Sequence, residues 1–117
     1  MRRILTKAET KVMNALWSFP EGEGRGMDIV KACGEPRPAQ TTVLTFLRIL
    51  QQKGYVTPRR EGRGYVFTPT ISKDDYRHIF LEYTRRTLFD CSPMEDIVKF
   101  MLERGIITRE TLLKLAE

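Results

Sequence analysis

The most regular pattern of apolar and polar positions lies between residues 39 and 69, and it predicts a helix followed by a short hairpin. At about 100° per residue, the apolar side chains of the first half gather on one helix face: Val43, Phe46, Leu47 and Leu50. Such a stripe is typical of a helix that packs on a core. Gly54 tolerates the positive φ that ends many helices, so we expect this helix to stop near Lys53.

The residues that follow predict two antiparallel strands. Residues 55–60 and 64–68 are short aromatic and β-branched runs, and the spacer Glu61-Gly62-Arg63 forms turns readily. Pro58 lacks a backbone donor, which suits an edge strand. We therefore expect a two-stranded hairpin with a basic tip.

Two further helices are expected before this segment. Thr6 and Glu9 have the spacing of a capping box, so the first helix should begin there and run to about Trp17. A brief second helix is expected over residues 27–33. Residues 21–26 predict a loop or a short strand that pairs with the hairpin.

After the hairpin the pattern is helical again. Ser72 is expected to cap a helix that reaches about residue 90. Ser92 and Pro93 predict a cap followed by proline at the first helical position, and Gly105 ends that helix. Thr108 is expected to cap a last short helix.

Three helices and a basic hairpin are the parts of a winged helix-turn-helix DNA-binding module. The fold class is therefore mainly α with a small β wing: a winged-helix domain in residues 1–70 and a helical dimerisation region in residues 71–117. The later helices cannot build a self-sufficient core. Packing on their own winged-helix domain is one solution; pairing with a second copy is favoured, because two-fold dimers read palindromes. The expected dimer contacts are Tyr76, Phe80, Tyr83, Met94, Ile97, Val98 and Met101.

Charge supports a nucleic-acid partner for the first half. The net charge of +5 is divided unevenly, with +6 in residues 1–70 and −1 in residues 71–117. A basic half beside a nearly neutral half indicates a nucleic-acid reader joined to a segment that binds protein. For a winged helix, the expected nucleic acid is a double-stranded DNA operator.

The face of the third helix opposite its apolar stripe contains no carboxylate and is predicted to enter the major groove. Hydroxyls, methyl groups and a guanidinium can all contact base edges there. The candidates on this helix are Gln40, Thr41, Leu44, Thr45 and Arg48, with Thr42 partly inward. On the hairpin, Arg59, Arg60 and Arg63 are expected to contact phosphate or the minor groove.

The chain resembles the penicillinase repressors, the family of winged-helix regulators that includes methicillin-resistance and copper-responsive repressors. The matching residues are Leu5-Thr6-Lys7-Ala8-Glu9, Val12, Met13, Leu16, Trp17, Thr41-Thr42-Val43-Leu44-Thr45, Leu47, Leu50, Lys53, Gly54, Gly62-Arg63, Tyr65 and Pro69. The resemblance implies a homodimeric repressor on a palindromic operator and keeps Thr42 as a DNA-binding candidate. Copper sensing is disfavoured, because the C-terminal region has only Cys91 in place of a cysteine-rich motif.

The resemblance also implies a route of release. Repressors of β-lactam-resistance genes in this family are cleaved at an Asn-Phe bond after a membrane-bound sensor protease responds, and the corresponding residues here are Lys99 and Phe100. Since lysine replaces asparagine, either the protease accepts Lys99 or another signal releases this member.

Other functional classes are poorly supported by the sequence. Cys33 and Cys91 are far apart and His78 is alone, so neither a metal site nor a disulfide framework is expected. No nucleophile-base pair or phosphate-binding loop indicates an enzyme, and no cofactor is expected. Without a signal peptide or a membrane-inserting segment, the expected location is cytoplasmic. The alternative function is a winged-helix module used only for protein contact.

Overall fold

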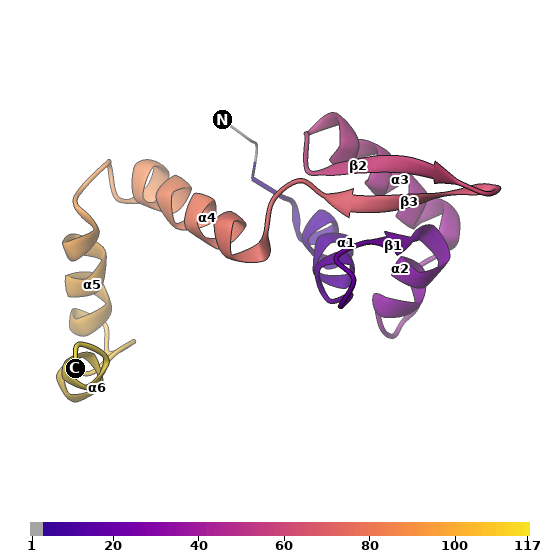
Figure 1. Ribbon diagram of the computed structural model, residues 1–117. Helices are drawn as coiled ribbons and strands as arrows, with labels where there is room; N and C mark the ends of the chain where they lie inside the picture. The colour runs from indigo at the N-terminus through magenta and orange to yellow at the C-terminus, as the bar shows by residue number, and fades with distance from the viewer. Residues whose placement is uncertain (1–3) are drawn as a thin grey trace. The chain divides into compact units, whose positions relative to one another are not determined.

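The computed structural model describes residues 4–117 and confirms a mainly helical fold with a small antiparallel sheet (Figure 1). The elements are α1 (Lys7–Trp17), β1 (Gly24–Arg25), α2 (Gly26–Ala32), α3 (Gln40–Gln52), β2 (Val56–Glu61), β3 (Gly64–Pro69), α4 (Lys73–Leu88), α5 (Met94–Glu103) and α6 (Arg109–Leu115). The predicted order of helices and hairpin is confirmed.

The sheet has the strand order β1-β3-β2. Strands β2 and β3 form the predicted hairpin, and Gly62 in its turn has a φ of 65°. The short segment before α2 is a strand: β1 pairs Gly24 with Phe67 and Arg25 with Val66. Gly24 fits beside the ring of Phe19, where a Cβ would overlap the aromatic carbons.

Side-chain caps begin three of the helices as predicted. The Thr6 hydroxyl accepts from the Glu9 amide and the Glu9 carboxylate accepts from the Thr6 amide, which completes the capping box of α1. Ser72 accepts from the amide of Asp75, and Thr108 accepts from the amide of Thr111.

The predicted start of α5 is wrong by one residue. Pro93 is the N-cap and Met94 the first helical residue, so Ser92 lies outside the helix. The reason is that Ser92 is committed to the preceding turn. Its amide donates to the Phe89 carbonyl, and its own carbonyl accepts from Arg85 Nη1 at 3.1 Å.

The core of the first half joins α1, α2, α3 and the base of the hairpin. Its fully buried side chains include Met13, Leu16, Ile29, Val43, Leu47, Leu50, Tyr55 and Val56. The predicted stripe of α3 is therefore confirmed for three members, while Phe46 is only half-buried. On α1 the buried position falls to Glu9 instead of its apolar neighbour Ala8, which is exposed.

Two compact units divide the chain, one ending at Arg77 and the other beginning at His78. The first unit passes the predicted boundary at residue 70 because later residues complete its core. Trp17 Nε1 donates to the carbonyl of Ile71 at 3.0 Å, and both Ile71 and Tyr76 are buried.

Tyr76 was predicted to lie at a dimer interface, and the structure instead places it in the core of the first unit. Its side chain is 7% exposed, and its hydroxyl accepts from the amide of Leu5 at 2.9 Å. Its ring centroid lies 5.8 Å from those of Trp17 and Tyr55. Tyr76 therefore packs within its own chain.

The second unit is built from the rest of α4 with α5 and α6. Arg85 pairs with Glu82 at 3.0 Å and also donates to the carbonyls of Cys91 and Ser92, which fixes the turn between α4 and α5. Phe89 and Phe100 meet edge to face at 5.6 Å. No residue that the structure describes in α5 or α6 is buried.

Candidate nucleic-acid interface

Helix α3 is held by its buried stripe and presents its opposite face to solvent. The exposed side chains on this face are Gln40, Thr41, Thr42, Leu44, Thr45 and Arg48. The helix ends where predicted, with Lys53 as its C-cap and Gly54 at a φ of 84°. The burial of Val43, Leu47 and Leu50 fixes the rotation of the helix, so the polar face is presented in one orientation.

Two threonines on this face differ from the sequence-based expectation in detail. Thr42 was predicted to face partly inward, but it is exposed. The Thr45 hydroxyl donates to the Thr41 carbonyl at 2.9 Å, which uses its only proton. Thr45 therefore retains an acceptor oxygen and a methyl group for an external partner.

The wing and α3 form one continuous surface. A groove of about 390 Å³ lies between them and is lined by Leu44, Arg48, Gln51, Pro58, Tyr65 and Phe67. Arg60 stands directly opposite Tyr65 in the hairpin, so both side chains lie on the same face of the sheet, which is the face that lines the groove. Leu44, Arg48 and Arg60 are thus brought toward the same side.

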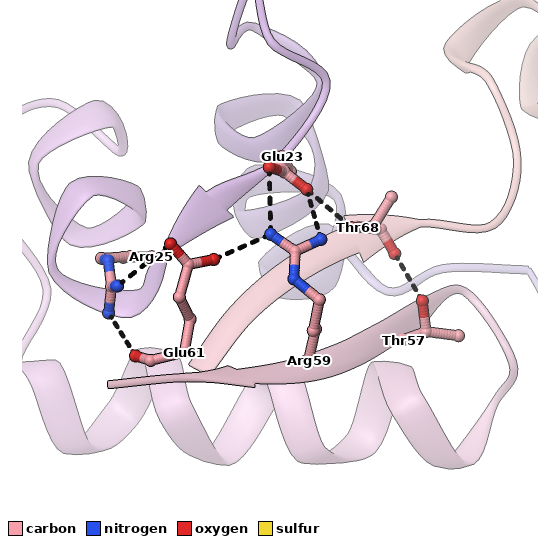
Figure 2. A network of polar contacts seen from close by, with 6 residues as sticks. All are labelled: Glu23, Arg25, Thr57, Arg59, Glu61 and Thr68. Atoms are coloured by element: carbon pink, nitrogen blue, oxygen red, sulfur yellow. Dashed lines mark hydrogen bonds and ion pairs between the residues drawn. The ribbon is translucent and has the colours of Figure 1, made fainter. Parts of the chain in front are cut away.

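Arg59 points to the other face of the hairpin. Successive strand residues point to opposite faces, so Arg59, which stands opposite Val66, lies on the face away from Arg60. There its guanidinium binds two carboxylates (Figure 2). Its guanidinium contacts Glu23 at 3.1 and 3.3 Å and Glu61 at 2.9 Å. The charge of Arg59 is already paired within the chain, which counts against the prediction that it contacts phosphate.

The ion pairs shift the pKa values of Arg59 and Glu23 in opposite directions. Hydrogen bonds to Glu23, and then to Glu61, raise the pKa of the Arg59 guanidinium above its ordinary value. In return, the hydrogen bond from Arg59 holds the pKa of the Glu23 carboxyl below its usual range, although desolvation acts in the opposite direction.

Lys53 is likewise paired with a carboxylate. Its Nζ lies 2.7 Å from Glu9 Oε1, and the Lys53 side chain is 17% exposed. Of the five basic residues between 48 and 63, two are thus paired with carboxylates. Among the residues described, no acid pairs with Arg48, Arg60 or Arg63, so these three supply the outward positive charge.

Several residues around this surface were not predicted from the sequence. Arg25 reaches the wing turn, where Nη1 donates to the Glu61 carbonyl at 3.1 Å. Tyr65 is 48% exposed and lines the groove, as does Gln51. The alternation of Tyr65 and Phe67 within a predicted strand could have placed both on the groove face, whereas no local signal pairs Arg25 with Glu61.

The other predicted site residues lie in the second unit. Phe80, Tyr83, Lys99 and Phe100 are exposed. Half-buried side chains make up the rest of the predicted dimer contacts: Met94, Ile97, Val98 and Met101. Residues 4–117 contain no cluster of three potential metal ligands, and no helix in that range is long and apolar enough to cross a bilayer.

A winged helix-turn-helix domain with an exposed polar helix face and a basic wing is the arrangement typical of DNA-binding proteins. Residues 5–117 match the penicillinase repressor family. The chain belongs to this family and is a DNA-binding transcriptional repressor.

Solved structures resemble the chain to different extents. The solution structure of the DNA-binding domain of the repressor BlaI is 29% identical, with a TM-score of 0.54, over 65% of this chain and 94% of that domain. Bordetella bronchiseptica BpsR, whose DNA binding is regulated by 6-hydroxynicotinic acid, is 22% identical over 87% of this chain and 74% of its own, with a TM-score of 0.49. No curated protein matches the chain significantly.

Proposed function

We propose that two copies of this chain bind a palindromic operator in double-stranded DNA and thereby repress transcription. The observation that carries the proposal is the shared surface of α3 and the wing. Leu44 and Arg48 of the exposed helix face line one groove with Tyr65 of the hairpin. An exposed helix fits the shape of the major groove, and a basic hairpin beside it complements the negative charge of the neighbouring phosphates.

In this proposal α3 reads bases and the wing supplies affinity. Arg48 donates to guanine or to phosphate, and the methyl groups of Leu44 and the threonines contact thymine methyl groups. The α3 contacts are proposed to be Gln40, Thr41, Thr42, Leu44, Thr45 and Arg48. Arg60 and Arg63 neutralise phosphates without selecting a sequence.

The second unit is proposed to join the two copies. Its exposed apolar side chains include Phe80, Leu81, Tyr83, Leu88, Phe100, Ile106, Leu113 and Leu115. Covering such surface with a second copy removes it from water. The proposed contacts are Phe80, Tyr83, Met94, Ile97, Val98 and Met101, without Tyr76.

We propose release by proteolysis in α5, at or near the bond between Lys99 and Phe100, in a response that controls β-lactam-resistance-type or related genes. Both residues are exposed, and cleavage there would divide the proposed dimer surface while leaving α3 intact. The protease is proposed to act downstream of, or as, a membrane-bound sensor. Lys99→Ala tests the site: the variant should remain uncleaved in cells in which the wild type is cleaved on induction.

A gel-shift titration tests the function itself. The full chain should shift DNA from the region upstream of its own gene in the presence of excess random duplex. Arg48→Ala should weaken that shift, whereas Lys11→Ala, on the exposed side of α1, should not. Equal affinity for upstream and random DNA would contradict sequence-specific repression.

A further inference from the structure

The outer part of the wing lacks a third strand. Strand β1 pairs only with Val66 and Phe67, so the outer pairs Arg60–Tyr65 and Glu61–Gly64 belong to β2 and β3 alone. An isolated two-stranded ribbon is marginally stable in water. Yet this outer part carries Arg60, and Arg63 lies in its turn.

Four charged side chains connect this outer part to the rest of the domain (Figure 2). Arg59 donates to Glu23, just before β1, through its two terminal guanidinium nitrogens at 3.1 and 3.3 Å, and it donates to Glu61 at 2.9 Å. From the end of β1, Arg25 donates to the Glu61 carbonyl at 3.1 Å, and its second nitrogen lies 3.7 Å from the Glu61 carboxylate. These four residues, Glu23, Arg25, Arg59 and Glu61, are called the wing clamp below.

The wing clamp is poorly suited to attracting DNA or to stabilising the fold. It contains two acids and two bases, so it adds no net charge. Its side chains are between 35% and 55% exposed, and ion pairs so exposed contribute little to stability. What a two-nitrogen contact between arginine and a carboxylate does supply is direction, because it fixes the relative orientation of both groups.

We propose that the wing clamp positions the outer wing, so that Arg60 and Arg63 meet DNA phosphates at fixed places. This inference rests on the proposed binding of DNA by the wing. Arg59 and Glu23 hold the middle of β2 to the segment before β1, and Arg25 holds the turn. Without the clamp, the outer wing has to be ordered when DNA binds, and the free-energy cost of that ordering weakens binding. The phosphate contact of Arg60 is then formed only part of the time.

A double-mutant cycle tests the proposal. The dependence of log K on log salt is measured for the wild type, Arg60→Ala, Glu23→Gln and the double variant. In the wild-type background Arg60→Ala should reduce the slope by about 0.9, the value for one phosphate contact. In the Glu23→Gln background the reduction should be less than half of that.

The cycle separates positioning from simple charge. Removing the Glu23 charge alters attraction to DNA equally on both sides of the cycle, so this effect cancels in the comparison. Glu21→Gln is the matched control, because Glu21 is an exposed acid of the same loop outside the clamp. In that background Arg60→Ala should retain its full effect. Arg25→Ala, which loosens the turn from its other side, should reproduce the behaviour of Glu23→Gln.

Two results would overturn the inference in different ways. If Arg60→Ala lowers the slope equally in the wild-type, Glu23→Gln and Arg25→Ala backgrounds, the clamp does not position the wing, although the wing still binds DNA. If Arg60→Ala leaves the wild-type slope unchanged, the wing contact of the proposed function fails, and the positioning role fails with it.

Discussion

Lys53 Nζ at the C-terminal end of α3 lies 2.7 Å from Glu9 Oε1 in the first turn of α1. Glu9 is 3% exposed, and the same carboxylate accepts from the amide of Thr6 at 2.8 Å. One buried side chain thus caps α1 and binds the end of the proposed reading helix. This pair connects the stability of the domain to the placement of α3.

Replacing Glu9 should destabilise the domain. Glu9→Gln keeps the size of the side chain but leaves the mostly buried Lys53 without its counter-charge. We expect the free energy of unfolding to fall by about 1–3 kcal/mol. Urea unfolding measures the effect, with Glu21→Gln, a change at an exposed acid, as the control. Similar losses of stability in both variants would show that the Glu9–Lys53 pair does not stabilise the domain.

The same pair predicts a pH dependence. Burial raises the pKa of Glu9, but the hydrogen bonds from Lys53 and Thr6 outweigh it and hold the pKa below its ordinary value of 4.5. A lowered pKa in the folded state means that the stabilisation is present above the ordinary value and is lost as pH falls through the folded value. The difference in stability between wild type and Glu9→Gln should therefore shrink below about pH 4.5. A difference that stays constant to lower pH would contradict this assignment.

Arg48 tests the reading face of α3. Because its side chain is exposed and lines the groove beside the wing, Arg48→Ala should cost about 1–3 kcal/mol of operator affinity. Thermal unfolding should be nearly unchanged. A loss of stability with unchanged DNA binding would place Arg48 on the wrong face.

Arg60 and Arg63 test the wing. Replacing both with alanine should weaken binding to operator and random DNA by similar factors, since phosphate contacts carry little sequence information. The slope of log K against log salt should fall by about 1.8, for two contacts. Arg109→Ala, in α6 and outside the proposed interface, serves as the control. An unchanged slope in the double variant would mean that the wing does not touch phosphate.

Tyr76 and Phe80 separate core from dimer surface on one helix. Tyr76 is 7% exposed and Phe80 is 46% exposed. Tyr76→Ala should therefore lower the free energy of unfolding by about 3–5 kcal/mol. Phe80→Ala should leave folding nearly intact and weaken self-association in sedimentation experiments. Equal destabilisation by both changes would count against the division.

The sequence predicted this fold well where local patterns determine it. Helical periodicity located the buried stripe of α3, and the spacing of Thr6 and Glu9 located the start of α1. Periodicity also grouped Tyr76 with Phe80, but it could not tell which residue is covered by the chain itself. The covering atoms of Tyr76 come from Leu5, Trp17 and Tyr55, which are far away in sequence.

The charged contacts were missed for the same physical reason. Glu9 and Lys53 are 44 residues apart, and Glu23 and Arg59 are 36 apart, so only the folded chain brings them together. A count of basic residues therefore overestimated the charge available to DNA. Strand alternation would have separated Arg59 from Arg60, but the groove face had to be known to decide which one faces α3.

The central claim is that two copies read two half-sites, and binding to paired duplexes tests it most directly. One duplex carries the palindrome protected by the protein upstream of its gene, and the other has one half-site replaced by random sequence. The account predicts two chains on the intact palindrome and a loss of affinity on the order of a hundredfold when one half-site is replaced. A single chain on the intact palindrome, or equal affinity for both duplexes, would contradict it.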